Sequence, residues 1–160
     1  MIKEVKNYIE FLAHQHRLLG HREHTPHFAY LNDEKDLRLP AEMGYPFVLF
    51  GHDGYQMTED GSHLRWSVLL SVQTHVADTG DEREKNRAMN LCSKILLDIL
   101  ARATSMEEMT KHRFLRGISL GGATATPVEN AGGSLYGWVI EFAITLPWCR
   151  EPNTERWEDK

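Results

Sequence analysis

Two stretches of the chain repeat apolar residues at three- and four-residue spacing, which predicts two amphipathic helices. The first covers residues 2–19 and is expected to end at Gly20, because glycine readily adopts the left-handed conformation that closes a helix. The second begins near Asp81, whose carboxylate can accept from the first free amides, while Glu84 can reach back as in a capping box. The apolar stripe of this second helix comprises Ala88, Leu91, Cys92, Ile95, Leu96, Ile99 and Leu100.

Other stretches have the pattern of strands. A short apolar run from Pro46 ends at Gly51, and residues 64–78 then alternate between apolar and polar positions, which is typical of a strand with one buried face. Residues 112–120 and 135–146 are predicted as two more strands, and Pro147 ends the last one. Within the irregular segment 21–45, residues 27–31 could form a further short strand.

The predicted order is therefore helix, strand, strand, helix, strand, strand. Without the strand-helix-strand alternation of parallel sheets, this order predicts an α+β fold: an antiparallel sheet of about four strands with two helices packed on it. The same element order, read cyclically, occurs in ferredoxin-like folds, an analogy that says nothing of function.

The length of 160 residues predicts a single domain over the whole chain. It would consist of the N-terminal helix (1–20), an irregular histidine-rich connection (21–45), an α+β core (46–147) and a C-terminal tail (148–160). The formal charge of -5 shows no basic excess of the kind expected of a nucleic-acid binder, and no apolar run is long enough to span a membrane. Cys92 and Cys149 form neither a disulfide framework nor a C-x-x-C metal motif.

Residues 117–121 match the G-x-S-x-G pattern around the nucleophile of serine hydrolases, which makes Ser119 a candidate nucleophile. In those enzymes a helix follows the serine, and the acid and histidine come later in the chain. Here the last histidine, His112, precedes the serine, and a Gly-rich segment broken by Pro127 follows it. We therefore expect a strand that ends in a Gly-Gly turn.

Five of the nine histidines lie within residues 14–27. Imidazoles are good zinc ligands, so His21, His24 and His27 are candidate metal ligands in the connection. His14 and His16 are two positions apart and would point to different sides of a helix. Solvated loop histidines are the favoured interpretation, and neither a bound metal nor a cofactor is expected.

Acidic residues outnumber basic ones between residues 46 and 81. Asp53 and Asp60 each precede glycine, which is ordinary turn chemistry. The alternative is a weakly electronegative edge that faces a partner. The net charge of this region is -4 (1 minus 5), from Arg65 against Asp53, Glu59, Asp60, Asp78 and Asp81.

The run from Pro46 to Pro147 has a strand pair, a helix preceded by an acidic loop, and a final strand "GWVIEFAITLP" reached through a Gly-rich hairpin. In this pattern it resembles the tail terminator and tail-completion proteins of long-tailed bacteriophages, which include minor tail and head-tail joining proteins. The resemblance implies a non-enzymatic structural protein that forms a homo-oligomeric ring, with a hexamer as the expected size. It also implies tail-tube and neck proteins as partners, and the bacterial cytoplasm and the virion as locations.

We expect the contacts of such a ring in polar hairpin loops and in the tail, because loop tips on a rigid sheet can adjust to a partner. Two other functions stay open: a small ligand-binding or regulatory α+β domain, and a metal-dependent enzyme that uses the histidines of residues 14–27. The candidate partner-contact residues are Asp53, Tyr55, Asp60, Val128, Asn130, Trp148 and Trp157.

Overall fold

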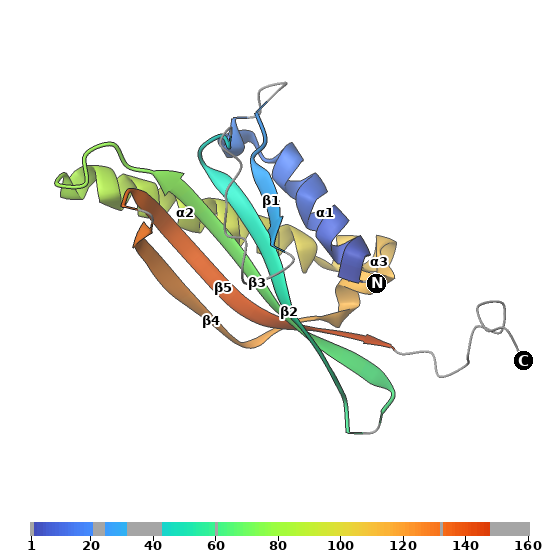
Figure 1. Ribbon diagram of the computed structural model, residues 1–160. Coiled ribbons are helices and arrows are strands. Elements are labelled where there is room, and N and C mark those ends of the chain that lie inside the picture. The colour runs from blue at the N-terminus through green and yellow to red at the C-terminus, as the bar shows by residue number, and fades with distance from the viewer. Residues whose placement is uncertain (1, 21–24, 32–42, 60, 132, 148–160) are drawn as a thin grey trace, which may run out of the picture.

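Five strands form one mixed sheet in the computed structural model, and helices cover one of its faces (Figure 1). The structure describes residues 2–20, 25–31, 43–59, 61–131 and 133–147. The strand order is β1-β2-β3-β5-β4; β1 runs parallel to β2, and all other neighbours are antiparallel. The elements are α1 (Ile2–Gln15), η1 (Arg17–Leu19), β1 (Phe28–Leu31), β2 (Phe47–Met57), β3 (His63–His75), α2 (Glu82–Ala103), α3 (Met106–Lys111), η2 (Arg113–Gly117), β4 (Ile118–Ala131) and β5 (Leu135–Pro147).

The α+β class is confirmed, but the prediction of four antiparallel strands in the order α-β-β-α-β-β is wrong. Residues 28–31 form β1, which adds a parallel edge strand to β2 through four residue pairs. A helix of six residues, α3, follows α2, and its first turn is capped by Ser105, whose side chain accepts a hydrogen bond from the Glu108 amide. The possible short strand at residues 27–31 is thus confirmed as β1. The helix α3 was not predicted, because six residues are too short to show a clear hydrophobic period.

Two predicted boundaries in the second half of the chain are also wrong. Arg113–Gly117 was predicted as strand but forms the 3₁₀ helix η2, and β4 begins at Ile118. The Gly-rich stretch after Ser119 was predicted as a turn and a loop, yet β4 continues through it to Ala131 with an interruption in register between Ser119 and Thr124. The strand β5 beside it pairs with β4 on both sides of this interruption, at Ile118 and Ser119 and again from Thr124 to Val128, which holds the Gly-rich stretch in the sheet.

The main core lies between the sheet and the helices α1 and α2. The alternation predicted for residues 64–78 is confirmed, because Val68, Leu70 and Val72 of β3 are buried against the helices. In α2 most of the predicted stripe is buried and Leu91 is partly buried. The first predicted helix consists of α1, which ends at Gln15, and the 3₁₀ turn η1. Gly20 ends η1 in the left-handed conformation (φ 62°), as predicted for the end of the helix.

The cap of α2 is confirmed in part. Asp81 accepts from the amide of Arg83 at 2.8 Å, as predicted. Glu84 does not close a capping box with Asp81. Its two carboxylate oxygens instead accept from the amides of Ala77 and Asp78, at 3.0 and 3.1 Å. The side chain therefore ties the loop before the helix to its first turn.

A buried carboxylate joins the three helices. Glu108 of α3 is 4% exposed, and its Oε2 accepts from the Tyr8 hydroxyl of α1 at 2.5 Å. Its Oε1 accepts from Arg102 at the end of α2 at 2.9 Å and from Lys111 at 3.4 Å. The hydrogen bond from Tyr8, helped by the charges of Lys111 and Arg102, lowers the pKa of Glu108 against the opposing effect of burial. Burial, followed by the hydrogen bond to Glu108, raises the pKa of Tyr8 to about 12.

This network predicts an acid-sensitive fold. Because the pKa of Glu108 is lowered in the folded state, its contribution is present above the ordinary value of 4.5 and is lost as pH falls through the folded pKa. We expect Glu108→Gln to lower the urea midpoint at pH 7 and the deficit to shrink as the pH falls below 4.5. Glu107→Gln is the matched control on the exposed side of α3 and should have a smaller effect. A deficit that is independent of pH would contradict this account.

Gly137 of β5 lies closely against β3. A Cβ at this position would overlap the Val72 carbonyl oxygen and would lie 2.8 Å from the Gln73 Cα. Both are backbone atoms of the central ladder, where Gln73 pairs with Gly137, so they cannot turn aside as a side chain would.

We expect Gly137→Ala to destabilise the fold by about 1–3 kcal/mol, the usual cost of overpacking. Urea unfolding followed by circular dichroism measures this change. Gly121→Ala is the control, because a Cβ there meets nothing closer than the Ser119 hydroxyl at 3.9 Å. Equal midpoints for the two variants would show that β5 can move away from β3.

Candidate protein interface

The hairpin of β2 and β3 extends beyond the pairing of β1, and β5 stays beside β3 along this part of the sheet (Figure 1). Strand β1 pairs with β2 only as far as Gly51, whereas β2 continues beside β3 to Met57. The six residues from His52 to Met57 span about 20 Å at the usual rise of a strand. We call His52–Met57 together with His63–Trp66 the projecting hairpin.

The projecting hairpin is bent at its base. The register between β2 and β3 shifts between His52 and Tyr55, where Gly54 has φ 80°. The Asp53-Gly54 pair, whose sequence is typical of a turn, is therefore a bulge inside a continuous strand. Bulges increase local twist and redirect the strand that carries them.

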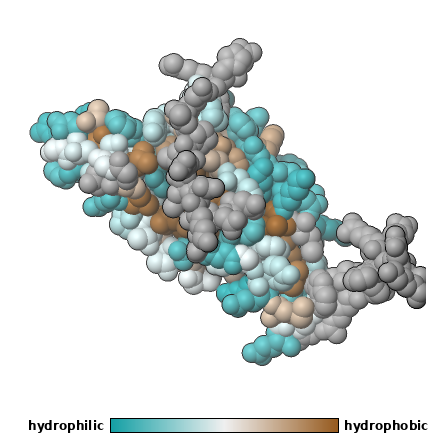
Figure 2. Space-filling model, viewed as in Figure 1, coloured by the Kyte–Doolittle hydropathy of each residue, from teal (hydrophilic) through white to brown (hydrophobic). Residues whose placement is uncertain are grey.

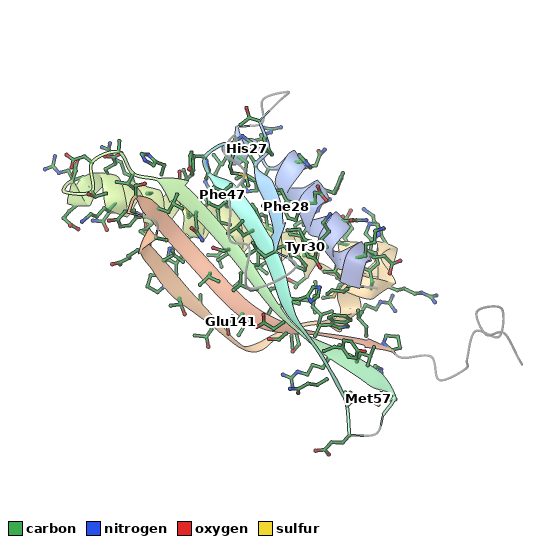
Figure 3. The ribbon with its side chains drawn as sticks, in the orientation of Figure 1. His27, Phe28, Tyr30, Phe47, Met57 and Glu141 are labelled. Carbon is green, nitrogen blue, oxygen red and sulfur yellow. The ribbon has the colours of Figure 1, made fainter. Side chains whose placement is uncertain are left out.

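Aromatic and apolar side chains line one face of the projecting hairpin. Tyr55 is 60% exposed and Met57 is 50% exposed. The rings of Tyr55 and His52 lie 4.9 and 5.0 Å from that of Trp66, and the His52 Nε2 is hydrogen-bonded to the Tyr30 hydroxyl at 2.6 Å. Figure 3 shows Met57 at the far end of the hairpin, well away from Tyr30.

The rings in this row carry polar atoms, and not all of these atoms have a hydrogen-bond partner. Within the described residues, the buried Nε1 of Trp66 has no hydrogen-bond partner. Tyrosine, tryptophan and methionine are enriched where proteins meet, because they provide a large contact area together with a few polar atoms. The exposed end of the row, at Tyr55 and Met57, therefore has the composition of a protein contact.

The turn of the hairpin is held by its own hydrogen bonds. The amide of Thr58 donates to the His63 carbonyl at 3.0 Å, and the amide of Gly61 donates to the Thr58 carbonyl at 2.7 Å. The Thr58 hydroxyl also accepts from the His63 amide at 3.1 Å. Glu59 is exposed beside this turn, which places a carboxylate at the outermost point of the described hairpin.

The sheet face opposite the helices carries two adjoining hollows. One, of about 350 Å³, has mainly apolar walls that include Leu49, Leu69 and Val139. The other, of about 430 Å³, has Arg65 and Glu141 beside small residues on its floor, and Asp53 lines both. Figure 2 shows separate patches of apolar surface on this side, among hydrophilic and intermediate residues.

The structure places the predicted contact residues on two surfaces. Asp53 and Tyr55 both lie on the projecting hairpin, and Asp53 also lines the apolar hollow of the open sheet face together with Val128. Asn130 lies in β4 and not in a loop, and its side chain is not among those described. Asp60, Trp148 and Trp157 lie outside the described residues. Met57 was missed, although its alternation with Tyr55 in the sequence places both on one face of a strand.

The structure describes both chemical motifs in part. Ser119 is exposed in β4 and is followed by more strand, so the strand-to-helix elbow of serine hydrolases is absent at this position. His27 is 4% exposed, and its Nδ1 lies 2.7 Å from the Pro46 carbonyl oxygen. His16 contacts Asp98 of α2 at 3.3 Å, and His21 and His24 lie outside the described residues.

Metal and thiol chemistry find no support in the described part of the chain. No group of three or more histidine, cysteine or acidic side chains there is placed to hold a metal ion. Burial of Cys92 raises the pKa of its thiol to about 12, so the reactive thiolate is not formed at neutral pH.

A scan against protein-family models and a search of curated proteins found no match for this chain. None of the helices in the described ranges has the length and apolar character needed to cross a membrane.

Proposed function

We propose that this protein is a structural subunit of a phage or prophage tail, which forms a homo-oligomeric ring that terminates or joins the tail tube. The observation that carries the proposal is the projecting hairpin, with Tyr55 and Met57 exposed near its end. An element that presents exposed aromatic and apolar side chains at its end is suited to contact a neighbouring subunit. The tail tube and the neck are the further partners.

The arrangement of the chain also suits a ring. A ring subunit repeats one heterologous contact, so it needs a projecting element and a different surface that receives it. The hairpin is rigid because Met57 still pairs with Leu64 at its far end. Such a rigid projection can define the angle between neighbours, which decides whether a ring closes.

One observation favours a second candidate, a small-ligand-binding domain. The polar hollow of about 430 Å³ on the open sheet face has Arg65, Glu141 and Asp53 at its margins. An amino acid has the two charges that such a site would recognise. A rise in melting temperature with an amino acid, lost in Arg65→Ala, would support this alternative.

Light scattering coupled to gel filtration tests the ring. We expect untagged protein to reach the mass of a closed ring, with a hexamer as the expected size, as its concentration increases. Tyr55→Ser with Met57→Ser should remain monomeric, because the contact loses its aromatic and apolar side chains. Both residues are exposed, so we expect the free energy of unfolding of this double variant, measured with urea, to stay within about 0.5 kcal/mol of that of wild type.

Tail tubes assembled from the tube protein of the same phage or prophage give the second measurement. We expect negative-stain images to show the protein at one end of the tubes. A wild-type protein that neither forms rings nor binds tube ends would contradict the proposed function. The Phe11→Ser variant is a control, because Phe11 is 53% exposed on α1, away from the hairpin.

A further inference from the structure

A basic recess lies beside the end of β5, between η2 and the start of α1. It has a volume of about 460 Å³. Its lining includes the apolar side chains of Phe114, Leu146 and Pro147, and the guanidinium groups of Arg113 and Arg116. Glu4 also lines it, so with His63 neutral the net charge of the lining is +1 (2 minus 1).

One of the two arginines, Arg116, is fixed by a hydrogen bond to the backbone of α3. Arg116 donates from its Nε to the Met109 carbonyl oxygen at 3.0 Å, which fixes the start of its guanidinium group against α3. Both arginines are exposed in the described structure. A guanidinium group pairs with a carboxylate through two parallel hydrogen bonds, so the recess is suited to an acidic group next to an apolar one.

The end of the projecting hairpin has this chemistry. Met57 is exposed, Glu59 is exposed two residues later, and the sequence continues with a second acidic residue, Asp60. The hairpin and the recess are therefore complementary in charge and in apolar character. His63, at the end of the hairpin, also lines the recess, so the hairpin end and the recess adjoin in one copy. Met57 is separated from Leu146 by β3, because Met57 pairs with Leu64 and Leu64 pairs with Leu146.

We propose that the hairpin end of one copy docks into the basic recess of a second copy, with Glu59 against Arg113 and Arg116, and Met57 against Phe114 and Leu146. This inference rests on the proposed ring function and assigns its subunit contact. The donor residues Met57 and Glu59 differ from the acceptor residues Arg113, Arg116 and Phe114. Each subunit can therefore give its hairpin end to one neighbour and receive that of a second neighbour, which is a heterologous contact. Repetition of such a contact closes a ring when the rotation between neighbours permits it.

Charge reversal with mixing tests the contact. Glu59→Lys places a cation against the arginines, and Arg113→Glu places an anion against Glu59, so each variant alone should associate about a hundredfold more weakly than wild type. When the two variants are mixed, every contact pairs opposite charges again. The lysine introduced in the hairpin of one variant meets the glutamate introduced in the recess of the other, and the unchanged Glu59 meets the unchanged Arg113. We therefore expect the mixture to recover rings in which the two variants alternate.

Matched variants separate this effect from a general change of charge or fold. Glu129→Lys and Lys94→Glu reverse exposed charges on β4 and α2, away from both surfaces, and should form rings like wild type. Circular dichroism and urea unfolding of each variant show whether it is folded. Masses are measured by light scattering up to the highest soluble concentration, in low and in high salt, because salt should weaken the contact.

The outcomes divide the inference from the function on which it rests. Monomeric single variants with recovery on mixing support the docking. Rings that form equally well in both single variants overturn it, and the proposed function then stands on another contact. If the single variants still form rings but no longer bind tail tubes, the docking is also overturned, since the recess then receives a tail partner. A wild-type protein that stays monomeric at every concentration overturns the docking, and tube binding alone then decides the proposed function.

Discussion

The antiparallel ladder between β3 and β5 is the constraint on which the rest of the structure depends. It pairs the two strands residue by residue from His63 with Pro147 to His75 with Leu135. These are the two central long strands, and their alternation assigns Val68 and Phe142 to the helix face and Ser67 and Ala143 to the open face. The ladder therefore decides where α1 and α2 can bury their apolar faces, and its close approach at Gly137 leaves no room for a Cβ there.

The length of this ladder also explains the projecting hairpin. The helices cover the part of the sheet near Val68 and Val72, and β1 stops pairing at Gly51. Beyond these limits β3 still has β5 on one side and β2 on the other, so the pairing of β2 with β3 resumes after the bulge and continues to Met57. Its side chains at Tyr55 and Met57 consequently remain exposed, although the pattern that places them is the same as in the core.

Sequence patterns predicted the parts of the fold in which the hydrophobic pattern repeats over many residues. The alternation of residues 64–76 and the stripe of α2 each contain enough apolar positions to identify one face, and both are confirmed. Strand β1 has only four residues and pairs in parallel with β2. Its assignment depends on a neighbour that local sequence does not specify. The Asp53-Gly54 pair is typical of a turn, but β2 pairs with β3 before and after it, so the pair forms a bulge inside the strand.

The candidate interface was predictable only where it is formed by one local segment of the sequence. Tyr55 was found because its segment is polar and flanked by turn residues, whereas the recess was missed, since its lining comes from α1, η2 and two strands that are far apart in sequence. Arg113 lies in a segment that was predicted as strand, where its side chain would have been assigned to a solvent face. Only the tertiary structure brings it beside Leu146.

The two sides of the sheet differ in how open they are to association, and this difference supports the hairpin as the contact. Edge strand β4 contains Pro127, which lacks an amide hydrogen, and its register is interrupted on both sides of that residue. Proline and bulges at an edge oppose the addition of further strands. The strands of the projecting hairpin have no proline, and its exposed aromatic and apolar residues lie after the bulge, where β2 pairs with β3 again. Open-ended growth through β4 is thus disfavoured, while a defined contact through the hairpin end remains available, which is what a closed ring requires.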